Sequence, residues 1–284
     1  MFFIKFEGFG NDYIVFEAEQ VEAVSDLNDL ARRVCDRHYG AGADGITVVR
    51  ASSDESADFE VRIFNPDGSE ADLSGNGTRC SVAYLHYRKL WEREELRLRT
   101  RAGVKVYHLR KRESDGHYWF DSELGQPRFG SLSIPMTTDE PLARVVDYPL
   151  NVEGETVPVT ALQMGNPNCC IFTENFDSID WRRIGKLIEF HPQFPERTNV
   201  TFIRKIDRAN IEVRIWERGA GETFSSGTCS AAAAVASAFT DKTDRRLSVH
   251  TPGGRIEVNW RTDGEVILTG RADIVYSGEW LRDG

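Results

Sequence analysis

Residues 60–80 read EVRIFNPDGSEADLSGNGTRC, and residues 212–230 read EVRIWERGAGETFSSGTCS. The two stretches open on almost the same five residues, 152 positions apart. Three further matches follow at that spacing without a gap: Glu70 with Glu222, Ser74 with Ser226, and Gly75 with Gly227. Self-similarity at a fixed spacing is the signature of a repeated structural unit. The chain is therefore predicted to contain one fold twice.

Weaker matches on either side of these stretches keep the same order. Gly10-Asn11 recurs as Gly165-Asn166, and Thr100 with Gly103 recurs as Thr251 with Gly254. The spacing drifts by a few residues, as loop insertions would cause. The predicted halves are residues 1–130 and 131–284, with the active site expected at their junction. A segment of weak periodicity with several prolines, residues 130–158, is predicted to be the linker.

Each half has the same predicted order of elements. A Gly-Asn turn leads into a short apolar strand, a helix and a second strand; the Glu-Val-Arg-Ile strand, a Gly-rich loop, a second helix and late alternating strands follow. The predicted helices cover residues 27–38 and 77–91 in the first half, and 181–190 and 228–239 in the second. The predicted fold class is α+β, with two pseudo-symmetric halves that are each a β-rich shell around a central helix.

The bulk composition excludes several classes of protein. The 284 residues carry a net charge of −10 without a basic patch, which argues against general nucleic-acid binding. No apolar run approaches the roughly 20 residues of a membrane span, and the N-terminus lacks a signal-peptide pattern. The five cysteines fit no disulfide or zinc pattern, and the six histidines show no ligand spacing. We expect a cytoplasmic protein with no membrane contact, no metal and no cofactor.

A literal G-x-G-x-x-G occurs at Gly40, Gly42 and Gly45. In dinucleotide-binding proteins this motif follows a strand and opens a helix. Here it follows a predicted helix and opens a predicted strand at residues 46–49, so we interpret it as a tight turn.

The duplicated loops are the best candidates for chemistry, because each places Ser-Gly at the start of a helix. The first amides of a helix lack intrahelical partners and carry the positive end of its dipole, so they favour a carboxylate. Ser74 and Ser226 can equally serve as simple N-caps. If the two helix starts held one carboxylate, the serines would lie on opposite faces of the adjacent carbon. That geometry suits a two-base inversion of a stereocentre.

These residues resemble the diaminopimelate epimerase family, which interconverts LL- and meso-diaminopimelate without a cofactor in the formation of lysine and cell-wall precursors. The resemblance covers essentially the whole chain. It rests on six motifs, found at residues 8–13, 65–70, 75–80, 164–167, 194–199 and 217–223. It implies the family's two-half fold, closure of the halves around a small amino-acid substrate, independence of pyridoxal phosphate, and a possible homodimer.

The resemblance also implies roles for individual residues. The distal amino-acid head of the substrate would be held by four side chains: Asn65, Asn166, Asn199 and Arg218. Asn11 would line the site, and the reacting carboxylate would rest on two helix starts, Gly75-Asn76 and Gly227-Thr228. Glu217 matches a family residue that contacts the substrate amine near the reaction centre, and it joins Ser74 and Ser226 in the predicted catalytic set.

The sequence departs from the family at the reacting carbon. The family's two acid/base cysteines fall on Ser74 and Ser226, and a family histidine falls on Asn168. A serine hydroxyl is a far weaker acid than a thiol and needs an adjacent base. The candidates for that base are Glu70, Glu222, Glu217 and Cys229, although Glu70 and Glu222 can equally be loop carboxylates that bond to nearby amides.

Two origins of the serines stay open at this point: engineered replacements, or a divergent natural branch, which the changes at Asn168 and at residues 228–230 favour. Three functions also stay open. The first is an epimerase acting on diaminopimelate or a close analogue. The second is a different isomerase or lyase with a glutamate base, and the third is a non-catalytic amino-acid binder.

Overall fold

The computed structural model describes residues 1–281, which form two compact units. The first unit comprises residues 1–122 together with the chain from Thr269 onward, and the second spans Glu123–Leu268. The last strand, β17 (Val266–Glu279), pairs antiparallel with β1 (Phe2–Gly8), which places this strand from Thr269 onward in the first unit. The units therefore differ from the predicted halves 1–130 and 131–284 at two places, residues 123–130 and the C-terminal strand.

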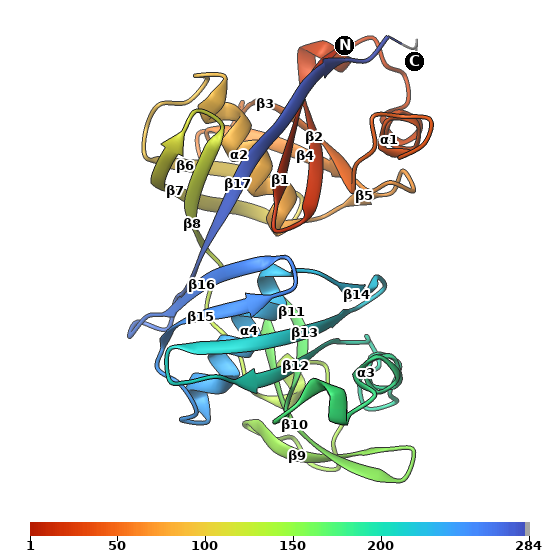
Figure 1. Cartoon of the computed structure of the whole chain (residues 1–284), viewed down its shortest axis with the longest axis vertical. Helices are drawn as coiled ribbons and strands as arrows, with labels where there is room; N and C mark the ends of the chain where they lie inside the picture. Colours follow the sequence, from red (N-terminus) through yellow and green to blue (C-terminus); the bar gives the residue numbers. More distant parts are fainter. Residues whose placement is uncertain (282–284) are drawn as a thin grey trace. The chain divides into compact units, whose positions relative to one another are not determined.

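The first unit is a mixed sheet with two α-helices (Figure 1). Its further elements are β2 (Asn11–Glu17), η1 (Ala18–Val21), α1 (Leu27–Cys35), β3 (Gly45–Ala51), β4 (Phe59–Phe64), β5 (Glu70–Ala71), α2 (Gly75–Tyr87), β6 (Glu95–Thr100), β7 (Gly103–Ser114) and β8 (His117–Glu123).

The second unit has the elements η2 (Ser131–Ser133), β9 (Val145–Val152), β10 (Glu155–Met164), β11 (Asn166–Phe172), η3 (Phe176–Ser178), α3 (Trp181–Glu189), β12 (Asn199–Lys205), β13 (Asn210–Glu217), β14 (Gly221–Thr223), α4 (Gly227–Phe239), β15 (Arg246–Thr251) and β16 (Gly254–Trp260). The predicted linker at residues 130–158 is wrong in part, because β9 and β10 form an antiparallel pair there.

The order and pairing of elements recur between the two units. Strand β2 runs parallel to β3 as β11 does to β12, and β4 runs parallel to β6 as β13 does to β15. The antiparallel pairs β3–β4 and β12–β13 correspond in the same way. The two Ser-Gly loops thus follow equivalent strands and open equivalent helices, α2 and α4.

Helices α2 and α4 are buried on all sides, unlike the amphipathic α1 and α3. Every residue of α2 from Asn76 to His86 is buried, and the contacts of this helix include β1, β2 and β3. Helix α4 is buried from Cys229 to Ser237, where the run Ala231–Ala234 lets strands approach it closely. A helix that is buried on every side is part of a core. Both functional helix starts are therefore fixed by packed surroundings.

Strand outweighs helix in the described residues, so the fold is richer in β-structure than the predicted α+β class suggested. All five cysteines are buried and unpaired with one another. Among residues 1–281, no helix has both the length and the apolar character to cross a bilayer.

Candidate active site

Ser74 is the N-cap of α2, as one of the two predicted interpretations required. Its backbone is extended (φ −133°, ψ 120°), and its Oγ accepts a hydrogen bond of 3.1 Å from the amide of Gly77. The same Oγ shares a hydrogen bond of 2.8 Å with the hydroxyl of Tyr13. The N-cap bond and the phenol together hold Ser74 at the helix start.

The first turn of α2 offers an open backbone beside a polar floor. A side chain at Gly75 would meet no heavy atom within 4 Å, so a ligand has room to reach the amides. Asn76 is buried, and its Nδ2 donates to Oδ1 of Asn11 at 3.2 Å. The predicted residues Asn11, Gly75 and Asn76 are therefore brought together. Asn65 lies in the preceding loop, where its Nδ2 donates to Ser69.

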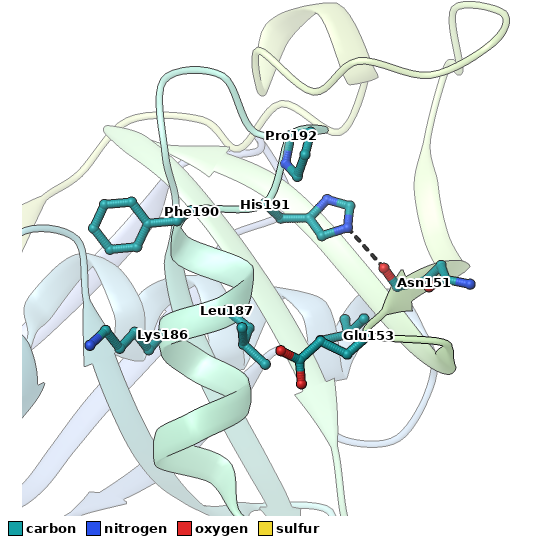
Figure 2. A pocket seen from close by; sticks show the side chains of 8 residues that line it. Asn151, Glu153, Lys186, Leu187, Phe190, His191 and Pro192 are labelled. Carbon is teal, nitrogen blue, oxygen red and sulfur yellow. Dashed lines mark hydrogen bonds between the residues drawn. The ribbon is translucent and has the colours of Figure 1, made fainter.

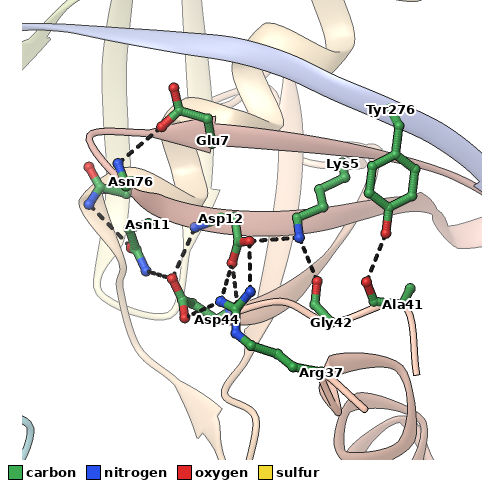
Figure 3. A network of polar contacts seen from close by, with 11 residues as sticks. Lys5, Glu7, Asn11, Asp12, Arg37, Ala41, Gly42, Asp44, Asn76 and Tyr276 are labelled. Carbon is green, nitrogen blue, oxygen red and sulfur yellow. Dashed lines mark hydrogen bonds and ion pairs between the residues drawn. The ribbon is translucent and has the colours of Figure 1, made fainter. Parts of the chain in front are cut away.

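Asn11 is held in turn by a network of charged groups (Figure 3). Its Nδ2 donates to Asp44 at 2.7 Å, and Arg37 bridges Asp44 and Asp12 at 2.8 Å each. Lys5 contacts Asp12 at 2.6 Å. Burial raises the pKa of Asp12, but the hydrogen bonds from Arg37 and Lys5 outweigh burial and hold that pKa below its usual value. This network fixes the amide orientation of Asn11.

Sequence reasoning missed Arg79, which lies one turn into α2. Its side chain is fully buried, Nη1 donates to Oδ1 of Asn76 at 2.9 Å, and the guanidinium lies over the ring of Phe9. No carboxylate in residues 1–281 pairs with Arg79, and burial lowers the pKa of its guanidinium. An arginine nevertheless stays protonated in proteins. The floor beneath the helix start is therefore positively charged.

Ser226 occupies the equivalent position in the second unit but has different partners. Its backbone is extended (φ −142°, ψ 128°), yet its side chain makes no N-cap bond. Instead, Oγ donates to the carboxylate of Glu217 at 3.2 Å, and the other carboxylate oxygen accepts from Thr223 at 3.2 Å. Burial raises the pKa of Glu217, and these two hydrogen bonds offset only part of the rise.

The other candidate bases are engaged elsewhere. Glu70 forms a two-pronged ion pair with Arg62, which lowers the pKa of its carboxyl group, and Glu222 forms one with Arg182. Burial raises the pKa of the Cys229 thiol to about 12. Glu217, which has no ion pair in the described residues, is the carboxylate placed to accept a proton from a serine.

Three predicted substrate residues of the second unit form one cluster around Asn199. Nδ2 of Asn199 donates to Oδ1 of Asn166 at 3.0 Å, and its Oδ1 accepts from the backbone amide of Arg218 at 2.8 Å. Asn168 joins the cluster by donating to Oδ1 of Asn166 at 3.0 Å. Arg218 is exposed, with Nη1 on the carbonyl of Glu196 at 3.0 Å.

Gly227 and Thr228, the predicted carboxylate cradle on α4, are half-buried. A side chain at Gly227 would contact only Leu268, at 3.5 Å, so the backbone there is also accessible. Near this helix, the methyl group of Thr228 approaches Gly165 of the Gly-Asn turn. The start of α4 therefore matches the start of α2 in openness and differs from it in the partner of its serine.

A surface cavity of about 500 Å³ lies elsewhere in the second unit, between α3 and the end of β9 (Figure 2). Its walls include Leu187, Phe190 and His191, whose Nε2 contacts the carbonyl of Asn151 at 2.9 Å. None of the predicted site residues lines it. The cavity is therefore separate from both helix starts.

Comparisons with known proteins find one family along nearly the whole length of the chain. The profile of the family described as diaminopimelate epimerase matches residues 3–129 and 160–275. Proteins named diaminopimelate epimerase from Pelotomaculum thermopropionicum and Moorella thermoacetica are each 41% identical, and the alignments cover 99% and 100% of both chains respectively.

Solved structures share the fold at low sequence identity. A phenazine biosynthesis protein of Bacillus anthracis is 19% identical with a TM-score of 0.68, and 99% of each chain is covered. A methylitaconate-delta-isomerase is 13% identical with a TM-score of 0.67, covering 98% of this chain and 95% of that one. Together with the profile match and the full-length relatives, these findings show that the chain belongs to the diaminopimelate epimerase family.

Proposed function

We propose that this chain is a cofactor-independent isomerase that moves a proton at the α-carbon of diaminopimelate or a close analogue. The observation that carries the proposal is the Ser226–Glu217 hydrogen bond at the start of α4. It supplies the base that a serine needs in place of a thiol. The substrate class comes from the names of the full-length relatives.

The proposed proton removal balances within this pair. Ser226 Oγ takes the α-proton of the substrate while its own proton passes to the Glu217 carboxylate, and the electron pair stays on the α-carbon. Because burial raises the pKa of Glu217, the carboxylate is a stronger base than an exposed one. Ser74 then supplies a proton on the opposite face, which inverts the centre.

The helix starts and Arg79 support the binding of a carboxylate. The open amides at Gly75 and Gly227 can donate to it, and the developing negative charge is stabilised by the helix dipoles. The Asn166–Asn199–Arg218 cluster, with Asn65, is proposed to hold the distal amino-acid head. We further propose that one substrate engages both serines at the junction of two pseudo-symmetric halves, each a β-rich shell around a central helix.

The cellular setting of the proposal follows from the family. We propose a cytoplasmic enzyme of lysine and cell-wall precursor synthesis that acts as a homodimer on a free amino acid. It requires neither a nucleic acid nor a membrane as partner.

The proposal is tested by incubating the protein with LL-diaminopimelate in D₂O and following the α-proton signal by NMR. We expect exchange and inversion in the wild-type protein, and we expect inversion to be lost in both Ser74→Ala and Ser226→Ala but to persist in the neighbouring Ser225→Ala. Binding by calorimetry without exchange would leave an amino-acid binder or a different substrate. The absence of both binding and exchange would exclude diaminopimelate as the substrate.

Arg79 gives a second prediction. Arg79→Met removes a buried cation that has no carboxylate partner in residues 1–281, so we expect the free energy of unfolding to be unchanged or higher. The Kd for diaminopimelate is expected to rise about 10-fold, because the carboxylate loses a nearby positive charge. Calorimetry and urea unfolding measure both effects. Arg88→Met, at the other end of α2, is the control; loss of stability with unchanged affinity would contradict the prediction.

A further inference from the structure

The ring of Tyr13 occupies a space that two glycines keep free. A Cβ atom at Gly45 would lie 2.5 Å from Cε1 of Tyr13, and one at Gly77 would lie 3.0 Å from the same atom. Both distances are too short for ordinary packing. Neither glycine has a positive φ angle, so close packing excludes the side chain: the Tyr13 ring is the nearest neighbour at both positions, and the carbonyl oxygen of Phe64 adds to the crowding at Gly45, at 2.8 Å. Tyr13 is thus buried in a slot formed by β3 and the first turn of α2.

This slot positions the Tyr13 hydroxyl next to Ser74. The Tyr13 hydroxyl and Ser74 Oγ are 2.8 Å apart, and the Gly77 amide donates to the same Oγ at 3.1 Å. Once Ser74 has given up its proton, its oxygen can only accept, so Tyr13 must then be the donor. The oxygen would accept two hydrogen bonds at the positive end of a helix. This arrangement stabilises a serine that has just acted as an acid.

In the second unit, the serine at the helix start has a hydrogen-bond partner of the opposite kind. In the repeat, Asn168 stands where Tyr13 does, and it bonds to Asn166 rather than to Ser226. Glu217 stands where Asn65 does in the first unit. Ser226 is therefore hydrogen-bonded to a carboxylate that accepts protons, whereas Ser74 is hydrogen-bonded to a phenol and an amide that can donate them. The two serines have equivalent places in the repeat and opposite hydrogen-bond partners.

We infer that Tyr13 is a positioning residue that makes Ser74 the proton donor of the pair, an inference that rests on the proposed function. The Ser74 O–H bond breaks as a C–H bond forms on the carbanion, and the Tyr13 proton then moves to Ser74 Oγ. A phenol is a stronger acid than an aliphatic alcohol, so this transfer is downhill. Water returns a proton to the phenolate. In the reverse direction the same steps run backwards.

The test compares Tyr13→Phe with the wild-type protein in D₂O, using LL- and meso-diaminopimelate as separate substrates. We expect inversion to fall roughly 10-fold to 100-fold for both. For the stereoisomer whose α-proton faces Ser226, carbanion formation continues and the carbanion persists. The former α-proton on Ser226 Oγ is then replaced by a deuteron from solvent. Ser226 returns that deuteron to the same face of the carbanion and recovers a hydron from Glu217. Exchange without inversion therefore rises for that isomer, whereas the other loses both exchange and inversion.

The matched control is Tyr107→Phe, because the Tyr107 hydroxyl bonds to Thr78, also in the first turn of α2. It is expected to leave the ratio of exchange to inversion unchanged. The alkaline limb of the pH profile of inversion should change in Tyr13→Phe and not in Tyr107→Phe. Only Tyr13→Phe removes the phenol that hydrogen-bonds to Ser74. Equal losses of exchange and inversion for both isomers, or no loss, would overturn the inference. A wild-type protein that neither exchanges nor inverts would instead overturn the proposed function.

Discussion

Glu217→Gln is expected to slow α-proton removal by about 10³-fold. The amide keeps the shape of the carboxylate and can still hydrogen-bond to Ser226 and Thr223, but it cannot accept the serine proton. Single-turnover exchange in D₂O measures the effect directly. Glu212→Gln, on the same strand β13 and ion-paired with Arg204 and Arg214, is the matched control and should retain activity.

The pH dependence provides an independent check on Glu217. Because burial raises the pKa of Glu217 above its ordinary value, the acid limb of the wild-type rate profile should lie above the range of an exposed glutamate. That limb should be absent from the residual activity of Glu217→Gln. A variant that kept most of its activity, or kept the acid limb, would show that another group removes the proton.

The same replacement should affect stability in the opposite direction. A raised pKa in the folded state means that folding disfavours the ionised carboxylate. The wild-type protein therefore has its full stability below the unfolded pKa of Glu217, near 4.5, and loses part of it as the pH rises through the folded pKa. Urea unfolding at several pH values should show that the free energy of unfolding of Glu217→Gln rises relative to that of the wild type between pH 5 and 8. No such gain would mean that Glu217 is solvated in the folded protein.

The repeat and the helix starts could be predicted from sequence because they depend on local patterns. The predicted helices at 27–38 and 77–91 exist, with bounds at 27–35 and 75–87. The first helix ends early because Asp36 leaves the helical region (ψ 123°), and the second because Lys89, just beyond its C-cap, adopts a positive φ of 56°. The rejection of a dinucleotide site also agrees with the structure, since Gly45 opens β3.

The partners of the two serines could not be predicted, because tertiary packing creates them. Tyr13 begins an apolar run that looks like any buried strand, and only the pairing of β2 with β3 places it between Gly45 and Gly77. The ion pair of Glu70 with Arg62 joins strands β4 and β5. Four glutamate and cysteine candidates looked alike in sequence, and their neighbours separate them. An arginine in a helix without any other Lys, Arg, Asp or Glu was the available signal for Arg79.

Restoring thiols at both positions is expected to raise the rate of α-proton exchange by about 10²-fold or more. A free cysteine has a pKa near 8.5, and a helix N-terminus lowers it, so Ser74→Cys with Ser226→Cys supplies a far larger fraction of the reactive anion than the serines do. The measurement is exchange in D₂O under reducing conditions. Ser225→Cys adds a thiol beside Ser226 and should produce no gain. An unchanged or lower rate in the double variant would place proton transfer away from these residues.

The thiol background also tests whether Glu217 acts through Ser226. A thiolate needs no adjacent base, so adding Glu217→Gln to the double cysteine variant should cost about 10-fold or less, instead of about 10³-fold. This difference is a coupling free energy between position 217 and the pair of positions 74 and 226, of which only Ser226 hydrogen-bonds to Glu217. If Glu217 only binds the substrate amine, the two losses will be equal. Unequal losses would show that the Glu217 carboxylate supplies the base that a serine needs and a thiolate does not. The Ser226–Glu217 pair would then be the functional replacement for one thiol.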